Sequence, residues 1–123
     1  MKKLLLAALL FASTAFATVN EIDEAGLNKI FKDKGVLVIE VYATWCGPCK
    51  IMAKTLEEVD RHYAGKIKFV KMDAEKNPSM QAIVHVFPTT LVLKDGEGAV
   101  AIMGAVEDPK KVIETLDKVL KSK

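Results

Sequence analysis

The sequence predicts a single domain of the α/β class, and three observations lead to this prediction. The chain has 123 residues, a length that suits one domain. Residues 36–42 form an almost continuously apolar, β-branched run, which is typical of a strand covered on both faces in a parallel or mixed sheet. From this run onward, strand and helix patterns come in the order β-α-β, a connecting segment and β-β-α.

Composition and charge exclude several classes of protein. The chain is 50% hydrophobic and 28% charged, which fits a globular protein and excludes collagen, coiled coils, polar disordered chains and multi-span membrane proteins. Its formal net charge of +2 gives no reason to expect a nucleic-acid partner. Two cysteines cannot form a disulfide scaffold, so a hydrophobic core must hold the fold together.

The N-terminal segment has the pattern of a signal peptide. The basic pair Lys2-Lys3 precedes an apolar run over 4–12, and Ala15-Phe16-Ala17 provides a small-x-small cleavage site. We therefore expect a signal peptide over 1–17, a mature domain over 18–123 and export to the periplasm. An uncleaved signal that anchors the protein in the membrane is the main alternative, although the apolar run is shorter than the ~20 residues that span a bilayer. A buried helix of the domain is a second alternative.

The domain is predicted to begin with a helix and the apolar strand. Residues 24–34 carry apolar side chains at helical spacing, Asp23 is a candidate N-cap, and Gly35 is expected to end the helix. After the strand over 36–42, the apolar face of a long helix repeats at steps of three and four residues: Met52, Leu56, Val59 and Tyr63. Gly65 is expected to end this second helix.

The next segments are predicted to form a strand, a short helical stretch and a hairpin. Residues 67–72 have a strand pattern, and the helical stretch runs from Asn77 to about Ile83. Two further strands, over 89–93 and 99–103, flank an Asp-Gly pair that is typical of a tight hairpin turn.

The last helix is predicted to begin at Asp108 and to run close to the end of the chain. Asp108 is its candidate N-cap and Pro109 its first residue, a position where proline costs no helical hydrogen bond. The predicted apolar face of this helix consists of Val112, Ile113, Leu116, Val119 and Leu120.

The reactive residues are concentrated in the motif Trp-Cys-Gly-Pro-Cys-Lys over 45–50, where the buried strand leads into the long helix. Cys46 is then placed at the helix N-terminus, where free N–H groups and the helix dipole favour a thiolate and lower the pKa of the thiol below its usual value. Cys49 lies about one turn further on, close enough to form a disulfide with Cys46. Pro48 fits the first helical turn and stiffens the segment between the two sulfurs.

Other functions for the two cysteines find less support. A zinc site needs about four ligands, and the other soft candidates, His62 and His85, lack the spacing of a zinc finger. Covalent haem attachment would need a histidine where Lys50 stands. A purely structural disulfide is a further alternative, although a bridge over so few residues restricts the unfolded chain little. We therefore expect no metal and no cofactor beyond a redox-active Cys46–Cys49 disulfide.

Several segments together resemble the thioredoxin family. The motif over 45–50 looks like the thioredoxin active site, and Phe87-Pro88-Thr89 resembles the loop that holds the family's cis-proline. Residues 94–97 and 103–105 look like the family's hairpin turn and the glycine turn before its last helix. The resemblance extends over about 36–121. It implies a thioredoxin fold, with a central mixed sheet flanked by helices, and dithiol–disulfide exchange as the activity.

The resemblance also implies roles for individual residues. Cys46 would attack a substrate disulfide to form a mixed disulfide, which Cys49 would then resolve. The backbone of Phe87, just before Pro88, would pair with the extended substrate chain. The expected substrate groove is shallow and consists of Trp45, Gly47, Pro48, Phe87, Pro88, Gly104 and Ala105. For Trp45, a buried position in the core is the alternative.

Two positions depart from the family pattern. Glu40 takes the place of a buried aspartate and is the only acid in its apolar strand. It is either an exposed residue at a sheet edge or a desolvated carboxyl with a raised pKa, which would take the proton of Cys49 through water with Lys71 as its partner. Lys54 stands where thioredoxins usually have a proline that kinks the long helix, so we expect a straighter helix here.

The sequence therefore predicts an exported thiol–disulfide oxidoreductase that works as a reductase. Gly47-Pro48 resembles the reducing members of the family, whereas the strong oxidants usually carry a histidine between the cysteines. The family implies protein disulfides or an apocytochrome c as substrates, a membrane-embedded thiol electron transporter as electron donor, and a monomer. An oxidase of secreted protein thiols and a non-catalytic chaperone or assembly module that binds peptides are the alternatives.

Overall fold

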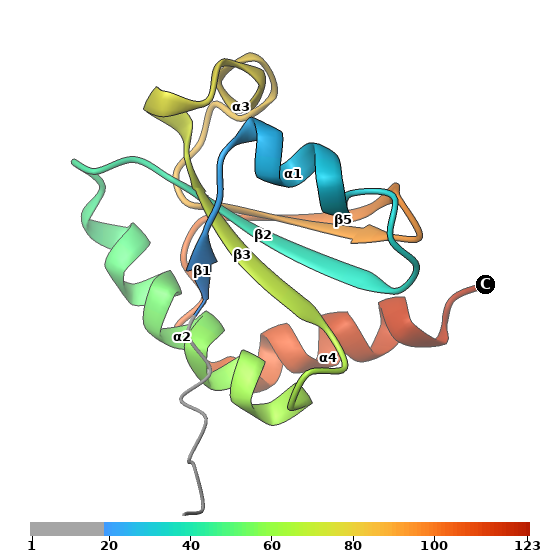
Figure 1. Cartoon of the computed structure of the whole chain (residues 1–123). Helices are drawn as coiled ribbons and strands as arrows, with labels where there is room; N and C mark the ends of the chain where they lie inside the picture. Colours follow the sequence, from blue (N-terminus) through green and yellow to red (C-terminus); the bar gives the residue numbers. More distant parts are fainter. Residues whose placement is uncertain (1–18) are drawn as a thin grey trace, which may run out of the picture.

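The computed structural model describes residues 19–123, so the predicted signal peptide and its cleavage site lie outside the described residues. The described chain forms one mixed five-stranded sheet with helices on both faces, which confirms the predicted α/β architecture (Figure 1). In chain order the elements are β1 (Asn20–Glu21), α1 (Glu24–Ile30), β2 (Val36–Tyr42), α2 (Gly47–Tyr63), β3 (Lys68–Asp73), η1 (Ala74–Lys76), α3 (Pro78–Ile83), β4 (Thr89–Lys94), β5 (Glu97–Met103) and α4 (Pro109–Lys121).

Strand β2 occupies the centre of the sheet, whose strand order is β1-β3-β2-β4-β5. It pairs in parallel with β3 and antiparallel with β4, while β5 forms an antiparallel edge. Every residue of β2 except Tyr42 is buried, because helices cover both faces of the sheet at this strand. The acidic residue of this strand, Glu40, is buried with the rest.

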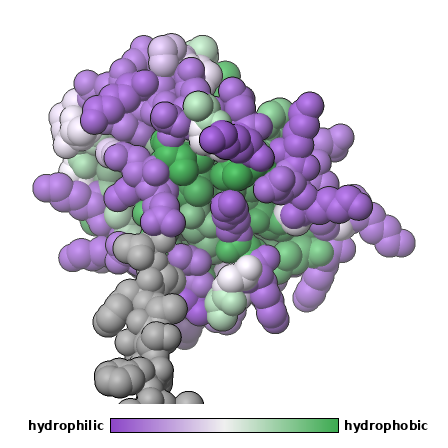
Figure 2. Space-filling view, viewed as in Figure 1, coloured by the Kyte–Doolittle hydropathy of each residue, from purple (hydrophilic) through white to green (hydrophobic). Residues whose placement is uncertain are grey.

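Hydrophobic cores fill the space on both faces of the sheet. The core under α2 and α4 includes Val38, Met52, Leu56, Val92 and Leu116. The core under α1 and α3 includes Ile39, Val41, Met72, Met80 and Val84. Each fully buried aliphatic side chain contributes about 1.5–3 kcal/mol, so the two cores together fix β2 and the point at which it leads into α2. Hydrophilic side chains cover most of the face shown in Figure 2, and hydrophobic residues show through near its centre.

Helix α2 carries the reactive motif at its start and is continuous to Tyr63. Its predicted apolar face is buried, which confirms the periodicity argument. The helix ends at Ala64, which adopts a left-handed conformation with φ 47° immediately before Gly65. The helix is uninterrupted at Lys54, because lysine retains the backbone N–H that a proline would remove.

Some element boundaries differ from the prediction, and one strand was not predicted. Helix α1 ends at Ile30 because residues 32–34 are charged, exposed and unable to add an apolar side chain to the core. Strand β1 was not expected, since two residues are too few to show an alternating pattern. Strand β5 begins at Glu97, and a register shift opposite Val92 and Leu93 interrupts its alternation.

Helix α4 begins as predicted, with the Asp108 side chain accepting a hydrogen bond from the N–H of Lys110. The assignment of Leu120 to its apolar face is wrong, because this side chain is 40% exposed. Consecutive helical residues point about 100° apart, so Val119 turns towards the core and Leu120 turns away from it.

Candidate active site

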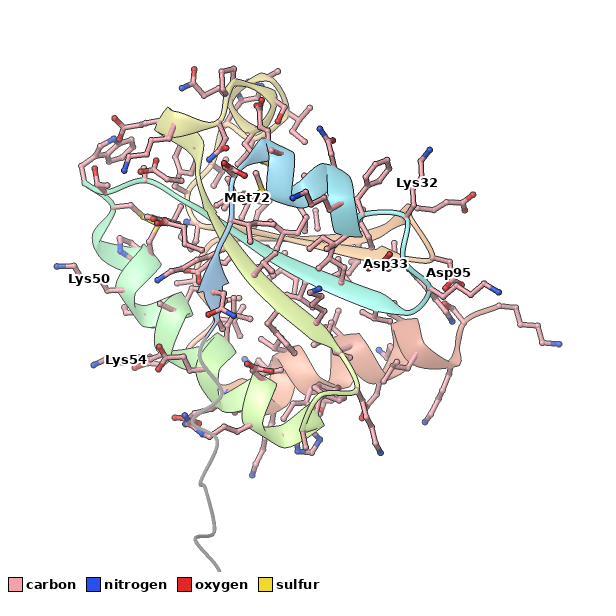
Figure 3. All side chains as sticks on the ribbon, in the orientation of Figure 1. Lys32, Asp33, Lys50, Lys54, Met72 and Asp95 are labelled. Atoms are coloured by element: carbon pink, nitrogen blue, oxygen red, sulfur yellow. A yellow bond between two sulfur atoms is a disulfide. The ribbon has the colours of Figure 1, made fainter. Side chains whose placement is uncertain are left out.

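The two cysteines lie where the chain leaves β2 and enters α2. Cys46 is the N-cap of α2 and is joined by a disulfide to Cys49, with 5.4 Å between the Cα atoms. The N–H of Cys49 donates a hydrogen bond to the Sγ atom of Cys46 (3.2 Å), so this sulfur accepts one of the free donors of the first helical turn. Pro48 occupies that turn, as predicted. Figure 3 shows the disulfide as a yellow bond near Lys50.

The loop before β4 lies against this disulfide. The Phe87–Pro88 peptide bond is cis, as the resemblance implied. The carbonyl oxygen of Pro88 accepts a hydrogen bond from the N–H of Gly104 (2.8 Å), which joins the loop to the glycine turn after β5. The rings of Trp45 and Phe87 meet edge to face with their centroids 5.8 Å apart, and Phe87 also packs against the buried cysteines. The structure thus brings Trp45, the cysteine pair, the cis-proline and the glycine turn together at one end of the sheet.

Apolar side chains around the cysteines are exposed. Trp45 is 71% exposed, so the alternative of a core position for this residue is wrong. Sequence reasoning missed three large apolar residues that are exposed: Ile83 at the end of α3, Val86 in the loop before β4 and Met103 at the end of β5. Met103 pairs with Thr89, directly after the cis-proline. Ile83 and Met103 were missed because an apolar residue within a predicted helix or strand is ordinarily assigned to the core. Val86 lies between two predicted elements, where no pattern indicates whether a side chain is exposed.

A pocket of about 310 Å³ opens beside the disulfide. Both cysteines line it, together with Glu40, Tyr42, Lys50 and Lys71. A volume of this size has room for several water molecules, since one water occupies about 30 Å³ in the liquid. Protons could therefore pass between Cys49 and Glu40 through water, without direct contact between the two side chains.

Glu40 is a buried carboxyl with an altered protonation equilibrium. It is 2% exposed, so the interpretation as an exposed edge residue is wrong. Burial raises the pKa of Glu40 to about 7; attraction to Lys71 acts in the opposite direction, and repulsion from Glu57 adds to the rise. Lys71 is the neighbour of Glu40 in the parallel register of β2 and β3, which places both side chains on the same face of the sheet. A carboxyl with this pKa can both accept and release a proton near neutral pH.

A second pocket, of about 280 Å³, lies next to the exposed aromatic residues. Trp45 and Phe87 line it together with Ala43, Val84 and the exposed residue His85. Its position beside the cis-proline loop makes it an extension of the apolar surface around the cysteines.

The described residues contain neither a metal-binding cluster nor a membrane-spanning helix. Within residues 19–123, no three His, Cys, Asp or Glu side chains gather closely enough to hold a metal ion. In that same part of the chain, no helix has both the length and the apolar character needed to cross a membrane.

Comparisons with known proteins agree with this geometry. The family model described as Thioredoxin matches residues 18–118. A thioredoxin of Staphylococcus epidermidis (strain RP62A) is 41% identical over 88 residues, which cover 70% of this chain and 84% of the relative. A thioredoxin of Staphylococcus aureus (strain Mu50) is 40% identical over 88 residues, with the same two coverages.

Solved structures show the same architecture. The structure of Malassezia sympodialis thioredoxin (Mala s 13) aligns with a TM-score of 0.72 and 27% sequence identity, and the match covers 83% of this chain and 90% of that one. The structure of thioredoxin from Trypanosoma brucei brucei aligns with a TM-score of 0.75 over 89% of this chain and 97% of that one; at 22% identity this likeness concerns the fold alone.

A mixed sheet that carries a Cys-x-x-Cys disulfide at a helix N-terminus is the arrangement of a thiol–disulfide oxidoreductase. The chain belongs to the thioredoxin family, and its fold is the thioredoxin fold that the sequence predicted.

Proposed function

We propose that this protein is an exported reductase of protein disulfides. The observation that carries the proposal is the Cys46–Cys49 disulfide at the N-terminus of α2, with the buried carboxyl of Glu40 in the same pocket. This arrangement supplies both a nucleophile and a base for the second thiol.

The reaction consists of two exchange steps. In the reduced protein, the Cys46 thiolate attacks one sulfur of a substrate disulfide, a mixed disulfide forms, and the other substrate sulfur leaves as a thiolate. The thiol of Cys49 then gives its proton to the Glu40 carboxylate through water, and its thiolate attacks the Cys46 sulfur. The reduced substrate leaves, and the protein holds the Cys46–Cys49 disulfide.

The substrate chain is proposed to bind along the cis-proline loop. Among residues 19–123, neither the N–H nor the carbonyl group of Phe87 has a hydrogen-bond partner, so both are free to pair with an extended peptide. The remaining surface of the groove comes from residues with little side chain or with an apolar one: Trp45, Gly47, Pro48, Pro88, Gly104 and Ala105. A backbone-directed contact of this kind fits a protein that acts on many different disulfides.

We propose the reducing direction because few groups stabilise the Cys46 thiolate. A strongly oxidising pair needs a reduced form whose thiolate is strongly stabilised. In the disulfide form Cys46 Sγ accepts one backbone N–H, and the two residues between the sulfurs, Gly47 and Pro48, carry no charge. A moderately stabilised thiolate favours reduction of the substrate rather than oxidation.

Export is proposed from the N-terminal pattern. The family match begins at Thr18, directly after the expected cleavage site, and this agreement supports a leader that is separate from the domain. A reductase in an oxidising compartment must receive electrons, so we propose a membrane-embedded thiol transporter as the donor. Substrates with mispaired disulfides, or an apocytochrome c whose haem-binding cysteines are oxidised, fit this compartment.

A redox titration against glutathione tests the proposed direction. We expect the potential of the Cys46–Cys49 pair to be more negative than that of the glutathione couple. A clearly higher potential would make the protein an oxidase. Activity that survives in a Cys46→Ser/Cys49→Ser double variant would instead identify a peptide-binding module without redox chemistry.

A further inference from the structure

The hydroxyl group of Thr90 is buried without a hydrogen-bond partner. Thr90 lies in β4 with 0% of its surface exposed, and within residues 19–123 its Oγ1 atom is the only buried side-chain nitrogen or oxygen that lacks a partner. Burying a hydroxyl in this way costs free energy, so an unpaired one in a folded protein needs an explanation.

Other buried threonines of the same domain satisfy their hydroxyls. Thr55 Oγ1 donates to the carbonyl oxygen of Ile51 (3.2 Å), and Thr89 Oγ1 donates to that of Val86 (2.6 Å). Thr90 therefore differs from the other buried threonines, whose hydroxyl groups have acceptors.

Thr90 lies beside the buried carboxyl of the active site. In the antiparallel register of β2 and β4 it is the direct partner of Glu40, and Lys71 is the partner of Glu40 on the other side. Because residues directly opposite each other share a face, these three side chains form one row across the sheet, with Glu40 in the middle. The paired Cβ atoms of such neighbours lie about 4.5–5.5 Å apart, within reach of a side chain as long as glutamate.

Among the side chains around Glu40, one neutral hydrogen-bond donor is not already used. Helix α2 contributes the cysteine pair, Lys50 and Glu57, and β3 contributes Lys71. On β2 itself, the Tyr42 hydroxyl already donates to Glu21. The residues that β4 and β5 place in the same row, Thr90 and Ile102, do not titrate. Thr90 is thus the neutral side-chain donor that remains unused next to this carboxyl.

We propose that Thr90 is a positioning residue whose hydroxyl donates a hydrogen bond to the ionised carboxylate of Glu40. A carboxylate has two acceptor oxygens, so rotation of the glutamate side chain can bring one of them to the Thr90 hydroxyl while the other stays on the pocket side, where Lys71 lies. The bond forms when Glu40 is charged, because a hydroxyl bonds more strongly to a carboxylate than to a neutral acid. The inference rests on the proposed role of Glu40 as the base for Cys49, and it explains why a burial cost is retained at this position.

The direct test is the titration of Glu40 in the purified protein by NMR with ¹³C-labelled glutamate carboxyl groups. Thr90→Val replaces the hydroxyl by a methyl group of similar size, so the fold is retained while the donor is lost. We expect the Glu40 pKa to rise by about one unit, a tenfold change in its ionisation constant, because a hydrogen bond to the charged form no longer lowers it. Thr90→Ser, which keeps the donor, should leave the pKa unchanged.

Thr55→Val is the matched control, since it removes a buried hydroxyl that already has two partners, the carbonyl oxygens of Ile51 on α2 and of Glu107 before α4. It should lower the free energy of unfolding and leave the Glu40 pKa where it is. A Glu40 pKa that stays the same in folded Thr90→Val overturns the inference.

The pH profile of substrate reduction separates this inference from the proposed function. If Thr90→Val moves both the Glu40 pKa and the midpoint of the pH profile upward, the hydrogen bond and the base role are both supported. If the Glu40 pKa moves and the profile does not, the hydrogen bond stands and the base role of Glu40 fails.

Discussion

At the scale of single residues, the buried carboxyl of Glu40 distinguishes this active site from an ordinary exposed Cys-x-x-Cys pair. Its pKa is raised to about 7 from an ordinary value of 4.5, mainly by burial. A raised carboxyl pKa means that the folded state holds its proton more tightly than the unfolded state. The stability gained from this difference is fully present below the unfolded pKa and is lost as the pH rises through about 7.

Glu40→Gln should therefore stabilise the protein and slow its turnover. At pH 8 the neutral amide avoids the cost of burying a charge, and the free energy of unfolding should rise by about 2–3 kcal/mol. At pH 4 the gain should vanish, because Glu40 is then protonated in both states. Release of the mixed disulfide should become slower, since Cys49 loses its base. Urea unfolding at the two pH values and insulin-disulfide reduction measure the two effects.

The exposed residue Glu58 provides the control for this substitution, since Glu58→Gln changes the same charge on the surface of α2. We expect neither stability nor turnover to respond to it beyond a few tenths of a kcal/mol. An unchanged free energy of unfolding in Glu40→Gln would mean that the carboxyl is solvated and that the proton of Cys49 leaves by another route.

At the scale of secondary-structure elements, the active site depends on how α2 is held against its neighbours. The Tyr63 hydroxyl lies 2.7 Å from Asp117 Oδ1 and 3.0 Å from the carbonyl oxygen of Ile113, so it joins the end of α2 to α4. Burial, with the hydrogen bond to Asp117 and its charge, raises the pKa of this phenol, which stays neutral in the working range of pH.

Tyr63→Phe should weaken this junction without touching the redox chemistry. We expect the free energy of unfolding to fall by about 1–2 kcal/mol, because Asp117 and the carbonyl of Ile113 lose a partly buried donor. Insulin reduction at 25 °C should be unchanged, since the cysteines lie at the opposite end of the helix. Equal unfolding curves for Tyr63→Phe and the unchanged protein would contradict this assignment. Repeating Tyr63→Phe in an Asp117→Asn variant completes a double-mutant cycle, which measures the interaction free energy between the two side chains.

The elements that the sequence predicted well are those with a strong local pattern. The run at β2 and the apolar stripe of α2 extend over many residues, so their assignments depend little on the rest of the fold. The missed features depend on contacts between distant segments. Strand β1 exists through its pairing with β3, and the unpaired hydroxyl of Thr90 is apparent only in the register of β2 and β4.

For the active site too, short motifs could be predicted from the sequence, whereas exposure and burial could not. The cysteine pair and the cis-proline loop were identified from short motifs. Met103 and Val86 were not, because an exposed apolar residue and a core residue look alike in a sequence. Burial of Glu40 was one of two open interpretations, and only its central position in the sheet decides between them.

At the scale of the whole molecule, large apolar side chains are exposed around the disulfide. Trp45, next to Cys46, and Met103, which pairs with Thr89 after the cis-proline, are each 71% exposed. An exposed apolar surface around a reactive group favours contact with the backbone and apolar side chains of a protein substrate.

Met103→Asp should reduce activity towards proteins and spare small substrates. A buried charge at the contact should lower kcat/KM for insulin reduction about tenfold, which corresponds to ~1.4 kcal/mol. Reduction of oxidised glutathione, which is too small to reach the whole surface, should change little. Val100→Asp is the matched control, because Val100 lies on the same strand but pairs with Val92, away from the cis-proline. A loss of the same size in both variants would show that Met103 has no special part in docking.

The most direct test of the account is to trap the mixed disulfide with a protein substrate. The central claim is that Cys46, at the N-terminus of α2, attacks and that Cys49 resolves. Reduced Cys49→Ser should accumulate a covalent complex with insulin whose disulfides are intact, because the attacking thiolate remains and the resolving thiol is gone. Cys46→Ser should accumulate none. Complexes of equal amount in the two variants, seen by mass spectrometry after acid quenching, would contradict the assignment of attacking and resolving cysteine.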